Sequence, residues 1–404
     1  MKRCVSELLF ITLLVLGTLA VLPSPPNIRA AAAPQTSAVT VDFDSDRWLI
    51  KDPTAKKEEH LGRKSLFLSS NGFASLKDVE FEDGTVEVDV AASTPVEFPG
   101  VVFRFQSEDE HELFYLRPHH SGHDDATQYV PAFQGSHPWQ IYNGKGATAA
   151  AQIPVDQWLH VKIEVTGLVA KVFLNNAAEP TMVITDLKRG YSKGSVGVTC
   201  GAMGAYFSNF TYKTATPTAH VEPRYPEPAA GTLTKWELSE AFLTETVNPE
   251  ALPDAGALGS IKWLAVTAET PGMVVIDRYR RSPSFVAPFA FDRTLRLKEA
   301  KGTKVVFART EIYSDRAQTV KLSFGYSDEA TVFLNGQTLF TGKSAWRFRD
   351  QDFNGIMDVE HDAIYLPLKK GKNELVLAVK GYFGGWGFIC RLGSTTGLKI
   401  NQGM

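Results

Sequence analysis

The sequence contains only three cysteines in 404 residues. Cys4 lies near the N-terminus, whereas Cys200 and Cys390 lie far apart inside apolar segments that alternate like strands. Two distant cysteines provide neither a disulfide framework nor a metal cluster. We therefore predict that both are buried free thiols, because an unpaired cysteine packs as a small hydrophobic residue.

Runs of basic residues are also missing. The chain has 42 Lys and Arg against 45 Asp and Glu, which gives a net charge of −3. Nucleic-acid binding depends on clustered positive charge, so nucleic acid is excluded as an expected partner. The sequence has no glycine-rich phosphate loop, no Gly-x-Ser-x-Gly motif and no Cys–His nucleophile pair, and no cofactor is expected.

Long apolar runs are absent apart from one near the N-terminus, from Leu8 to Leu22. Lys2 and Arg3 precede it, and small residues around Ala30 follow it. This order predicts a secretory signal peptide over residues 1–32, with an uncleaved N-terminal anchor as the alternative. The protein is therefore expected to be secreted or periplasmic, without membrane insertion after the signal is removed.

Prolines divide the remaining chain into two parts. Pro217, Pro223, Pro226 and Pro228 fall among Thr, Ala and Glu. Proline restricts the backbone, so this composition indicates a semi-rigid linker over residues 213–231. It separates a predicted domain at 39–212 from a second one at 232–401.

Short segments of alternating apolar and polar residues predict strands in both parts. Residues 85–90 and 158–165 show the clearest alternation in the first part, and residues 305–312 and 330–340 are strand-like in the second. Asn335-Gly336 predicts a tight hairpin turn, because both residues accept positive φ. The fold class is therefore all-β, with one antiparallel sandwich followed by a second.

The first part resembles the concanavalin A-like lectin/glucanase superfamily, in the branch of laminin G-like and keto-disaccharide-hydrolase-like domains. The segments that carry the resemblance are GTVEVDV at 84–90, GVVFRF at 100–105, FYLRPH at 114–119, WLHVK at 158–162 and AYFSNF at 205–210. It implies a jelly-roll sandwich and a role connected with sugars.

The second part resembles the galactose-binding-like domains that accompany glycosidases. VFLNG at 332–336, LPLKKGKNEL at 366–375 and GGWGF at 384–388 carry this resemblance. It implies a second jelly-roll sandwich. We expect Trp386 and Phe388 to belong to its core, because they alternate along a strand.

The densest group of polar and aromatic residues lies between residues 115 and 139. Aromatic faces stack on sugar rings, while Arg and Gln supply planar hydrogen-bonding groups for hydroxyls. The sequence thus predicts non-catalytic binding of carbohydrate or a glycan-bearing surface. The candidate binding residues are Arg104, Tyr115, Arg117, His119, Gln128 and Trp139.

Two other functions remain open at this stage, a sugar hydrolase or lyase and a structural or adhesive module. Laminarinase-like members of the superfamily carry Glu-x-Asp-x-x-Glu on one strand, and glycosidases generally need two carboxyl groups. Here Glu87 and Asp89 match, but Ala92 replaces the last glutamate. We therefore predict no catalytic residues and interpret the two acids as a solvated strand face.

Two acidic or histidine-rich segments raise the question of a metal. Residues 119–125 contain three histidines and two aspartates in one loop, without the fixed spacing of a helical face. Residues 350–358 begin like a calcium loop, but His361 stands where an EF-hand has its bidentate glutamate. The prediction is that neither binds a metal.

Overall fold

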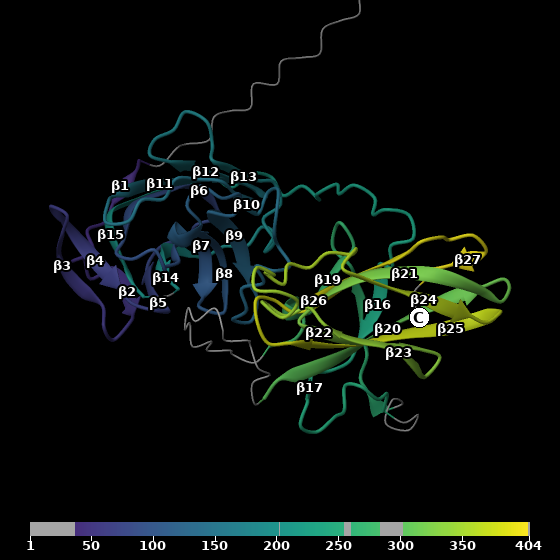
Figure 1. Cartoon of the computed structure of the whole chain (residues 1–404). Coiled ribbons are helices and arrows are strands. Elements are labelled where there is room, and N and C mark those ends of the chain that lie inside the picture. The colour runs from purple at the N-terminus through teal and green to yellow at the C-terminus, as the bar shows by residue number, and fades with distance from the viewer. Residues whose placement is uncertain (1–36, 202, 254–259, 283–301, 403–404) are drawn as a thin grey trace, which may run out of the picture. The chain divides into compact units, whose positions relative to one another are not determined.

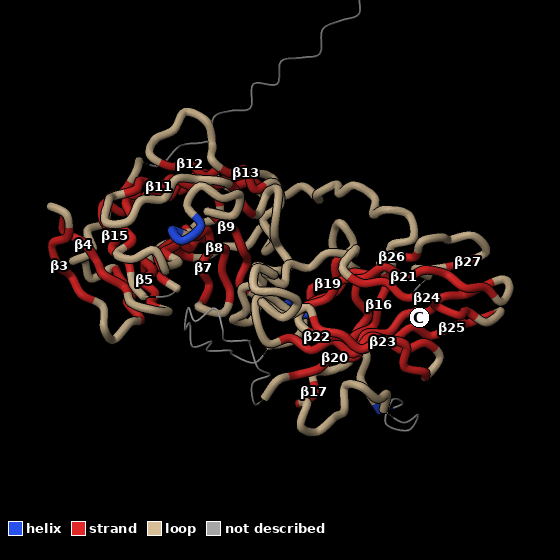
Figure 2. The backbone as a smooth tube through the Cα atoms, in the orientation of Figure 1, coloured by secondary structure: helices blue, strands red, loops and turns tan. Residues whose placement is uncertain are grey.

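The computed structural model describes residues 37–201, 203–253, 260–282 and 302–402 (Figure 1). These residues belong to one compact unit. The predicted signal peptide at 1–32 lies outside the described residues. Strands make up nearly all of the regular structure, and loops and turns connect them (Figure 2). The predicted all-β class is confirmed.

Two antiparallel sheets form the first half of the chain. Sheet A has the order β13-β12-β11-β6-β15-β4-β3, with β1 added to β15. Its strands are β1 (Val39–Thr40), β3 (Lys56–His60), β4 (Arg63–Leu68), β6 (Asp83–Ala92), β11 (Leu159–Thr166), β12 (Val169–Leu174), β13 (Met182–Ile184) and β15 (Ala205–Ala215). Sheet B has the order β10-β9-β8-β7-β14-β5-β2. Its strands are β2 (Trp48–Lys51), β5 (Gly72–Leu76), β7 (Pro99–Ser107), β8 (Glu110–Leu116), β9 (Thr127–Ala132), β10 (Thr148–Ala149) and β14 (Ser195–Cys200).

The alternation in the sequence explains how these sheets pack. In β11 the side chains of Val161 and Ile163 are buried, while the intervening Lys162 is partly exposed. The apolar face of sheet A meets side chains such as Phe103 and Phe114 from sheet B in one core. Alternate residues of β8 point away from that core, and Tyr115 packs in a separate small cluster with Trp139 at its margin.

The second half also contains two antiparallel sheets. Sheet C has the order β18-β16-β20-β25-β22-β23, with β17 and β27 both added to β20. Its strands are β16 (Lys235–Leu238), β17 (Phe242–Leu243), β18 (Leu264–Thr267), β20 (Lys304–Ser314), β22 (Glu329–Leu334), β23 (Gln337–Lys343), β25 (Gly371–Gly381) and β27 (Leu398–Lys399). Sheet D has the order β19-β26-β21-β24 and consists of β19 (Met273–Val275), β21 (Gln318–Ser327), β24 (Asp362–Leu368) and β26 (Gly387–Leu392).

Two local predictions for the second half are confirmed. Trp386 and Phe388 are fully buried in its core, and the indole N–H of Trp386 donates to the Val379 carbonyl at 3.0 Å. Asn335 and Gly336 have φ values of 51° and 85° and connect β22 to β23. Both residues adopt the left-handed conformation that a two-residue hairpin requires.

The proline-rich segment runs along the first half. Sheets A and B use residues up to Ala215, and sheet C begins at Lys235. Between them, the Thr218 N–H donates to Asp83 at 2.9 Å, and the Tyr225 hydroxyl bonds to Asp186 at 2.9 Å. These contacts hold the segment against the first sandwich, and its limited flexibility stays a prediction. Independent folding of the two halves stays a prediction.

The loop after β9 joins the first half to the second. Gln140 is fully buried there. Its Nε2 donates to the Asn354 carbonyl at 2.7 Å, and its Oε1 accepts from the Ser327 hydroxyl at 3.0 Å. Apolar residues from both halves cluster nearby: Phe133, Ile141, Tyr142, Ala147, Val275, Met357 and Ile389. The two sandwiches are therefore connected by a buried contact as well as by the chain.

Both cysteines in the described residues are buried and outside any disulfide bond, as predicted. Cys200 lies on β14 in the core of the first half, and Cys390 lies on β26 in the core of the second. Over the residues that the structure describes, none of the helices has the length and apolar character needed to cross a membrane.

Candidate carbohydrate-binding site

Five of the six predicted binding residues come together beside the β8 and β9 strands of sheet B. Tyr115 on β8 pairs with Gln128 on β9, and its hydroxyl donates to Gln128 Oε1 at 3.3 Å. Gln128 Nε2 donates to the carbonyl groups of Trp139 at 3.3 Å and of Tyr142 at 2.9 Å. The strand pair thus fixes the position of the loop that carries Trp139.

Arg117 connects this loop to the histidine-rich turn. Its Nη1 lies 2.6 Å from Asp125 Oδ2, and its guanidinium carbon lies 5.8 Å from the centre of the Trp139 ring. The 3-10 turn η1 (Pro118–His120) reverses the chain, so that His120 Nδ1 reaches Asp125 Oδ1 at 2.7 Å. Although burial acts to raise the pKa of Asp125, His120 and Arg117 lower it to about 2. Asp125 is therefore ionised at neutral pH.

His119 has the opposite character. Its ring lies 5.1 Å from the ring of Phe98, and burial lowers its pKa to about 4, with the charge of neighbouring groups adding to the effect. His119 is therefore neutral at pH 7. Its Nδ1 and the Nε of Arg117 are buried without a hydrogen-bond partner in the part of the chain that the structure describes. Unpaired buried polar atoms are uncommon in proteins and are often found at functional sites.

The five residues differ in how much they contribute to the surface. Tyr115 and Arg117 are 8% and 7% exposed, and Gln128 is fully buried. Trp139 and His119 are partly exposed. His120 and Asp125 join them, with side-chain exposures of 28% and 21%. We call this group, Trp139, His119, His120 and Asp125, the Trp139 surface, and Tyr115, Gln128 and Arg117 support it from below.

Aromatic residues of the second half extend the Trp139 surface. The Phe383 ring lies 6.0 Å from Trp139, and the Trp346 ring lies 5.7 Å from Phe383. All three rings are partly exposed. Sequence reasoning did not select Phe383 and Trp346, because only the buried contact around Gln140 brings them to this loop. It noted Asp125 and His120 but did not identify that Asp125 bonds to both Arg117 and His120.

Arg104 lies apart from the other five predicted residues. It sits at an irregularity of β7 with a φ of 49° and is fully buried. Its Nε donates to the Glu82 carbonyl at 2.9 Å and its Nη2 to the Gly167 carbonyl at 2.6 Å, and it forms an ion pair with Asp83 at 3.3 Å. Its donors therefore hold loops of the first sandwich together and point away from the surface.

The Glu87 and Asp89 pair belongs to a charged cluster on sheet A. His160 contacts both acids, with Nδ1 at 2.8 Å from Asp89 and Nε2 at 3.3 Å from Glu87. Arg63 also pairs with Asp89 at 2.5 Å. The interpretation as a solvated strand face is correct for Glu87, which is partly exposed, but wrong for Asp89, which is only 8% exposed. The bonds to His160 and Arg63 make that burial possible.

Neither candidate metal segment shows a ligand cluster. Within residues 37–402, apart from the short stretches that are not described, no three His, Cys, Asp or Glu side chains are grouped so as to hold a metal ion. In the second segment, Asp350 Oδ1 accepts the Asp352 N–H at 2.9 Å, and both residues are exposed. This geometry is an acidic turn.

Comparison with known proteins gives one family match, which lies in the first half of the chain. Residues 41–213 match the family model of the 3-keto-alpha-glucoside-1,2-lyase-like domain. This match supports the resemblance of the first half to the lectin/glucanase superfamily, and the galactose-binding-like resemblance of the second half stays a prediction. No curated protein matches the chain significantly.

Several solved structures are similar to part of the chain. The carbohydrate-binding module CBM66 from Bacillus subtilis is 18% identical, with a TM-score of 0.34, over 42% of this chain and 96% of that one. Domain 4 of the arabinanase AbnA from Geobacillus stearothermophilus, solved with arabinotriose, is 13% identical, with a TM-score of 0.31, over 46% of this chain and 96% of that one. The β-glucanase of Bacillus licheniformis is 9% identical, with a TM-score of 0.31, over 45% of this chain and 99% of that one. Similarity at this level assigns neither a ligand nor an activity to this chain.

Proposed function

We propose that the protein binds carbohydrate without chemical conversion, and that the Trp139 surface is the binding site. The observation that carries the proposal is a partly exposed indole ring held over a buried arginine and beside an ionised carboxylate. Trp139 lies 5.8 Å from Arg117, and Arg117 in turn lies 2.6 Å from Asp125. A sugar needs both an aromatic face for its C–H groups and fixed polar groups for its hydroxyls.

Each member of the site has a separate task in this proposal. The Trp139 ring stacks against the sugar, while Asp125 and His120 bond to hydroxyl groups at its edge. Arg117 is a positioning residue, because its side chain is mostly buried and contacts both Trp139 and Asp125. Its Nε and the Nδ1 of His119 offer two further polar atoms to a ligand that displaces the covering side chains.

Mutation of Trp139 provides the direct test. A glycan array with protein lacking residues 1–32 would first identify a ligand, and titration calorimetry would then measure its affinity. Removal of an aromatic side chain that stacks on a nucleic-acid base costs about 1–3 kcal/mol of binding free energy, and we take the same range for a ring stacked on a sugar. Trp139→Ala should therefore weaken binding about tenfold or more.

Trp158 supplies a matched control. It is also partly exposed and also has an arginine over its ring, with the Arg63 guanidinium 5.2 Å from the ring centre. It directly precedes β11 of sheet A, whereas Trp139 lies in the loop after β9 of sheet B. Trp158→Ala should leave the affinity unchanged. Equal affinities for the wild type and Trp139→Ala would contradict the proposal, as would equal losses in the two tryptophan variants.

A catalytic role is the second candidate, because the first half matches a lyase-like family and His119 is a neutral imidazole at pH 7. A neutral imidazole can accept a proton from a sugar carbon or hydroxyl. Incubation with a 3-keto-alpha-glucoside, followed by chromatography of the products, tests this role. Turnover that His119→Gln abolishes, while sugar binding persists, would favour the lyase over the binding protein.

We also propose that the protein acts outside the cytoplasm. The basic, apolar and small-residue order of residues 1–32 supports export. Mass spectrometry of the native protein should find an N-terminus near residues 31–34. Recovery of intact Met1 on cytoplasmic protein would contradict export.

A further inference from the structure

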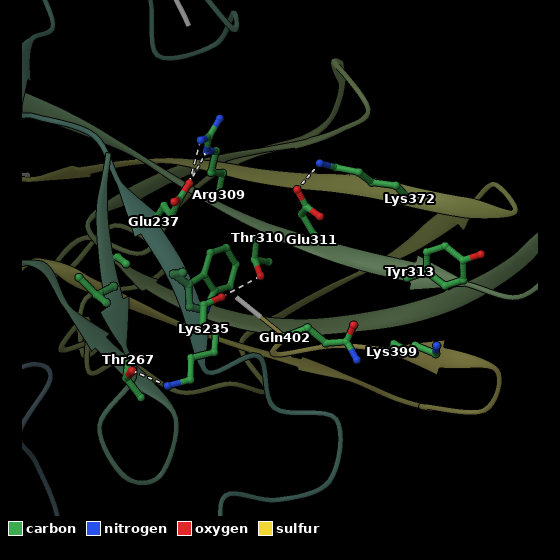
Figure 3. Close-up of a pocket in the computed structure, with 13 residues that line it drawn as sticks. Lys235, Glu237, Thr267, Arg309, Thr310, Glu311, Tyr313, Lys372, Lys399 and Gln402 are labelled. Carbon is green, nitrogen blue, oxygen red and sulfur yellow. Dashed lines mark hydrogen bonds and ion pairs between the residues drawn. The ribbon is translucent and has the colours of Figure 1, made fainter. Parts of the chain in front are cut away.

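A pocket of about 420 Å³, lined by both charged and apolar residues, lies on sheet C in the second half of the chain (Figure 3). Strands β16, β18, β20, β25 and β27 contribute its walls. Alternation along the strands produces this surface. Ile312 on β20 points into the core, while its neighbours Glu311 and Tyr313 line the pocket. On β16 the pocket is lined by Lys235 and Glu237 and by the mostly buried Trp236 between them.

Positive charge exceeds negative charge in this pocket. Four cationic residues line it, Lys235, Arg309, Lys372 and Lys399, together with the acids Glu237 and Glu311. The whole chain carries a net charge of −3, so the sign of the charge in this pocket is opposite to that of the chain as a whole.

Both acids are already paired with cations. Arg309 lies 2.7 Å from Glu237, and Lys372 forms an ion pair with Glu311 (Figure 3). Within each pair the positive and negative charges cancel, so two of the four cationic residues remain without an acidic partner among the lining residues. The surplus charge of the pocket therefore belongs to Lys235 and Lys399.

Lys235 and Lys399 have no ion pair among the described residues. The Nζ of Lys235 donates to the Thr267 hydroxyl at 2.8 Å, and the Nζ of Lys399 lies 5.8 Å from the centre of the Tyr313 ring. In Figure 3 Gln402 lies between the two lysines. Each ammonium group keeps donors for a ligand, since Lys has three and these contacts use few of them.

The uncharged groups of the pocket suit a sugar ring. Tyr313 is 47% exposed, so much of its ring is open to a ligand. The Thr267 hydroxyl and the Gln402 amide also line the pocket and can bond to hydroxyl groups. An exposed aromatic ring beside amide and hydroxyl groups is the arrangement that saccharides use, whereas two free ammonium groups call for negative charge on the ligand.

We propose that this pocket binds an acidic oligosaccharide, in which negative groups pair with Lys235 and Lys399 while a sugar ring packs on Tyr313. The site is separate from the Trp139 surface and does not depend on it. A carboxylate and a sulfate could each supply the negative group, and the choice of ligand in the test separates them.

Calorimetry with three oligosaccharides of equal length tests the proposal: an oligogalacturonate, a sulfated oligosaccharide and a neutral oligosaccharide. The protein should bind at least one acidic ligand more tightly than the neutral one, and binding should weaken as salt rises. The double variant Lys235→Gln/Lys399→Gln should bind the acidic ligand about tenfold more weakly. It removes two exposed ion pairs with the ligand, each of which contributes up to about 1 kcal/mol.

Lys57→Gln/Lys64→Gln is the matched control, because it removes the same charge from two exposed lysines of the β3–β4 hairpin. It should retain acidic-ligand affinity, and Trp139→Ala should do so as well, which separates this proposal from the first site. An equal loss of affinity in the two double variants would mean that only the net charge of the protein matters, and it would overturn the proposal. Preference for the neutral ligand, or unchanged affinity in Lys235→Gln/Lys399→Gln, would also overturn it.

Discussion

Asp277 makes the stability of the protein depend on pH. It lies in the 3-10 turn η2 (Ile276–Arg278) and is fully buried. Its Oδ2 accepts the Trp386 backbone N–H at 2.6 Å, and its Oδ1 has no hydrogen-bond partner within the described residues. Burial raises the pKa of Asp277 to about 7, although the bond from Trp386 opposes the rise.

The direction of the effect follows from comparing the folded and unfolded chains. In the unfolded chain the same carboxyl group ionises near its ordinary pKa of 3.8. Between pH 4 and pH 7 the folded protein holds a proton that the unfolded chain has lost, so stability falls as pH rises through this interval. For these two pKa values, the free energy of unfolding is lower by roughly 3 kcal/mol at pH 8 than at pH 5.

Asp277→Asn tests this reasoning, because asparagine has the shape of the protonated acid and no charge. Urea unfolding of both proteins at pH 5 and pH 8 would measure the free energies. The loss of stability between the two pH values should be smaller in the variant by about 2–3 kcal/mol. Burial also raises the pKa of Glu112 to about 7, but Glu112 is present in both proteins and cancels in the comparison. The same pH dependence in both proteins would refute the burial argument for Asp277.

Four further predictions concern the scaffold. Arg104→Met should cost about 3–5 kcal/mol in urea unfolding, because it leaves Asp83 and three carbonyl groups, two of them buried, without their cationic partner; a loss below 1 kcal/mol would contradict this. Gln140→Ala should cost about 1–3 kcal/mol by the same assay, since its two side-chain bonds to the second half are lost. Fragments 39–212 and 232–404 should each show cooperative unfolding by circular dichroism, at lower stability than the full chain. Gly336→Val should cost roughly 1–2 kcal/mol because φ at this position is 85°, and an unchanged melting temperature would argue against the hairpin geometry.

Much of the fold could be predicted from the sequence, because one face of most strands meets a core. The alternation at residues 158–165 corresponds closely to β11, and residues 305–312 fall within β20. In such strands the period of two directly determines which side chains are buried. Asn335-Gly336 was equally informative, since few other residue pairs tolerate its backbone conformation.

The candidate site was less predictable, because its properties depend on contacts between distant segments. Arg104 looked like a free donor in the sequence, but the irregularity in β7 turns it toward the carbonyls of Gly167 and Gly190. Arg117 and Asp125 are close in sequence, yet only the turn η1 between them determines that they pair. The pocket on sheet C combines residues as far apart as Lys235 and Lys399, which no local pattern connects.

The burial of both thiols has a practical consequence for labelling. Cys200 and Cys390 lie inside the two cores, and burial raises the pKa of the Cys390 thiol well above its ordinary value. A protein without residues 1–32 also lacks Cys4, so neither remaining cysteine should react readily with maleimide at neutral pH. A cysteine introduced at an exposed position, such as Tyr365 with 69% exposure, would then carry a single fluorophore or spin label without removal of any native residue from either core.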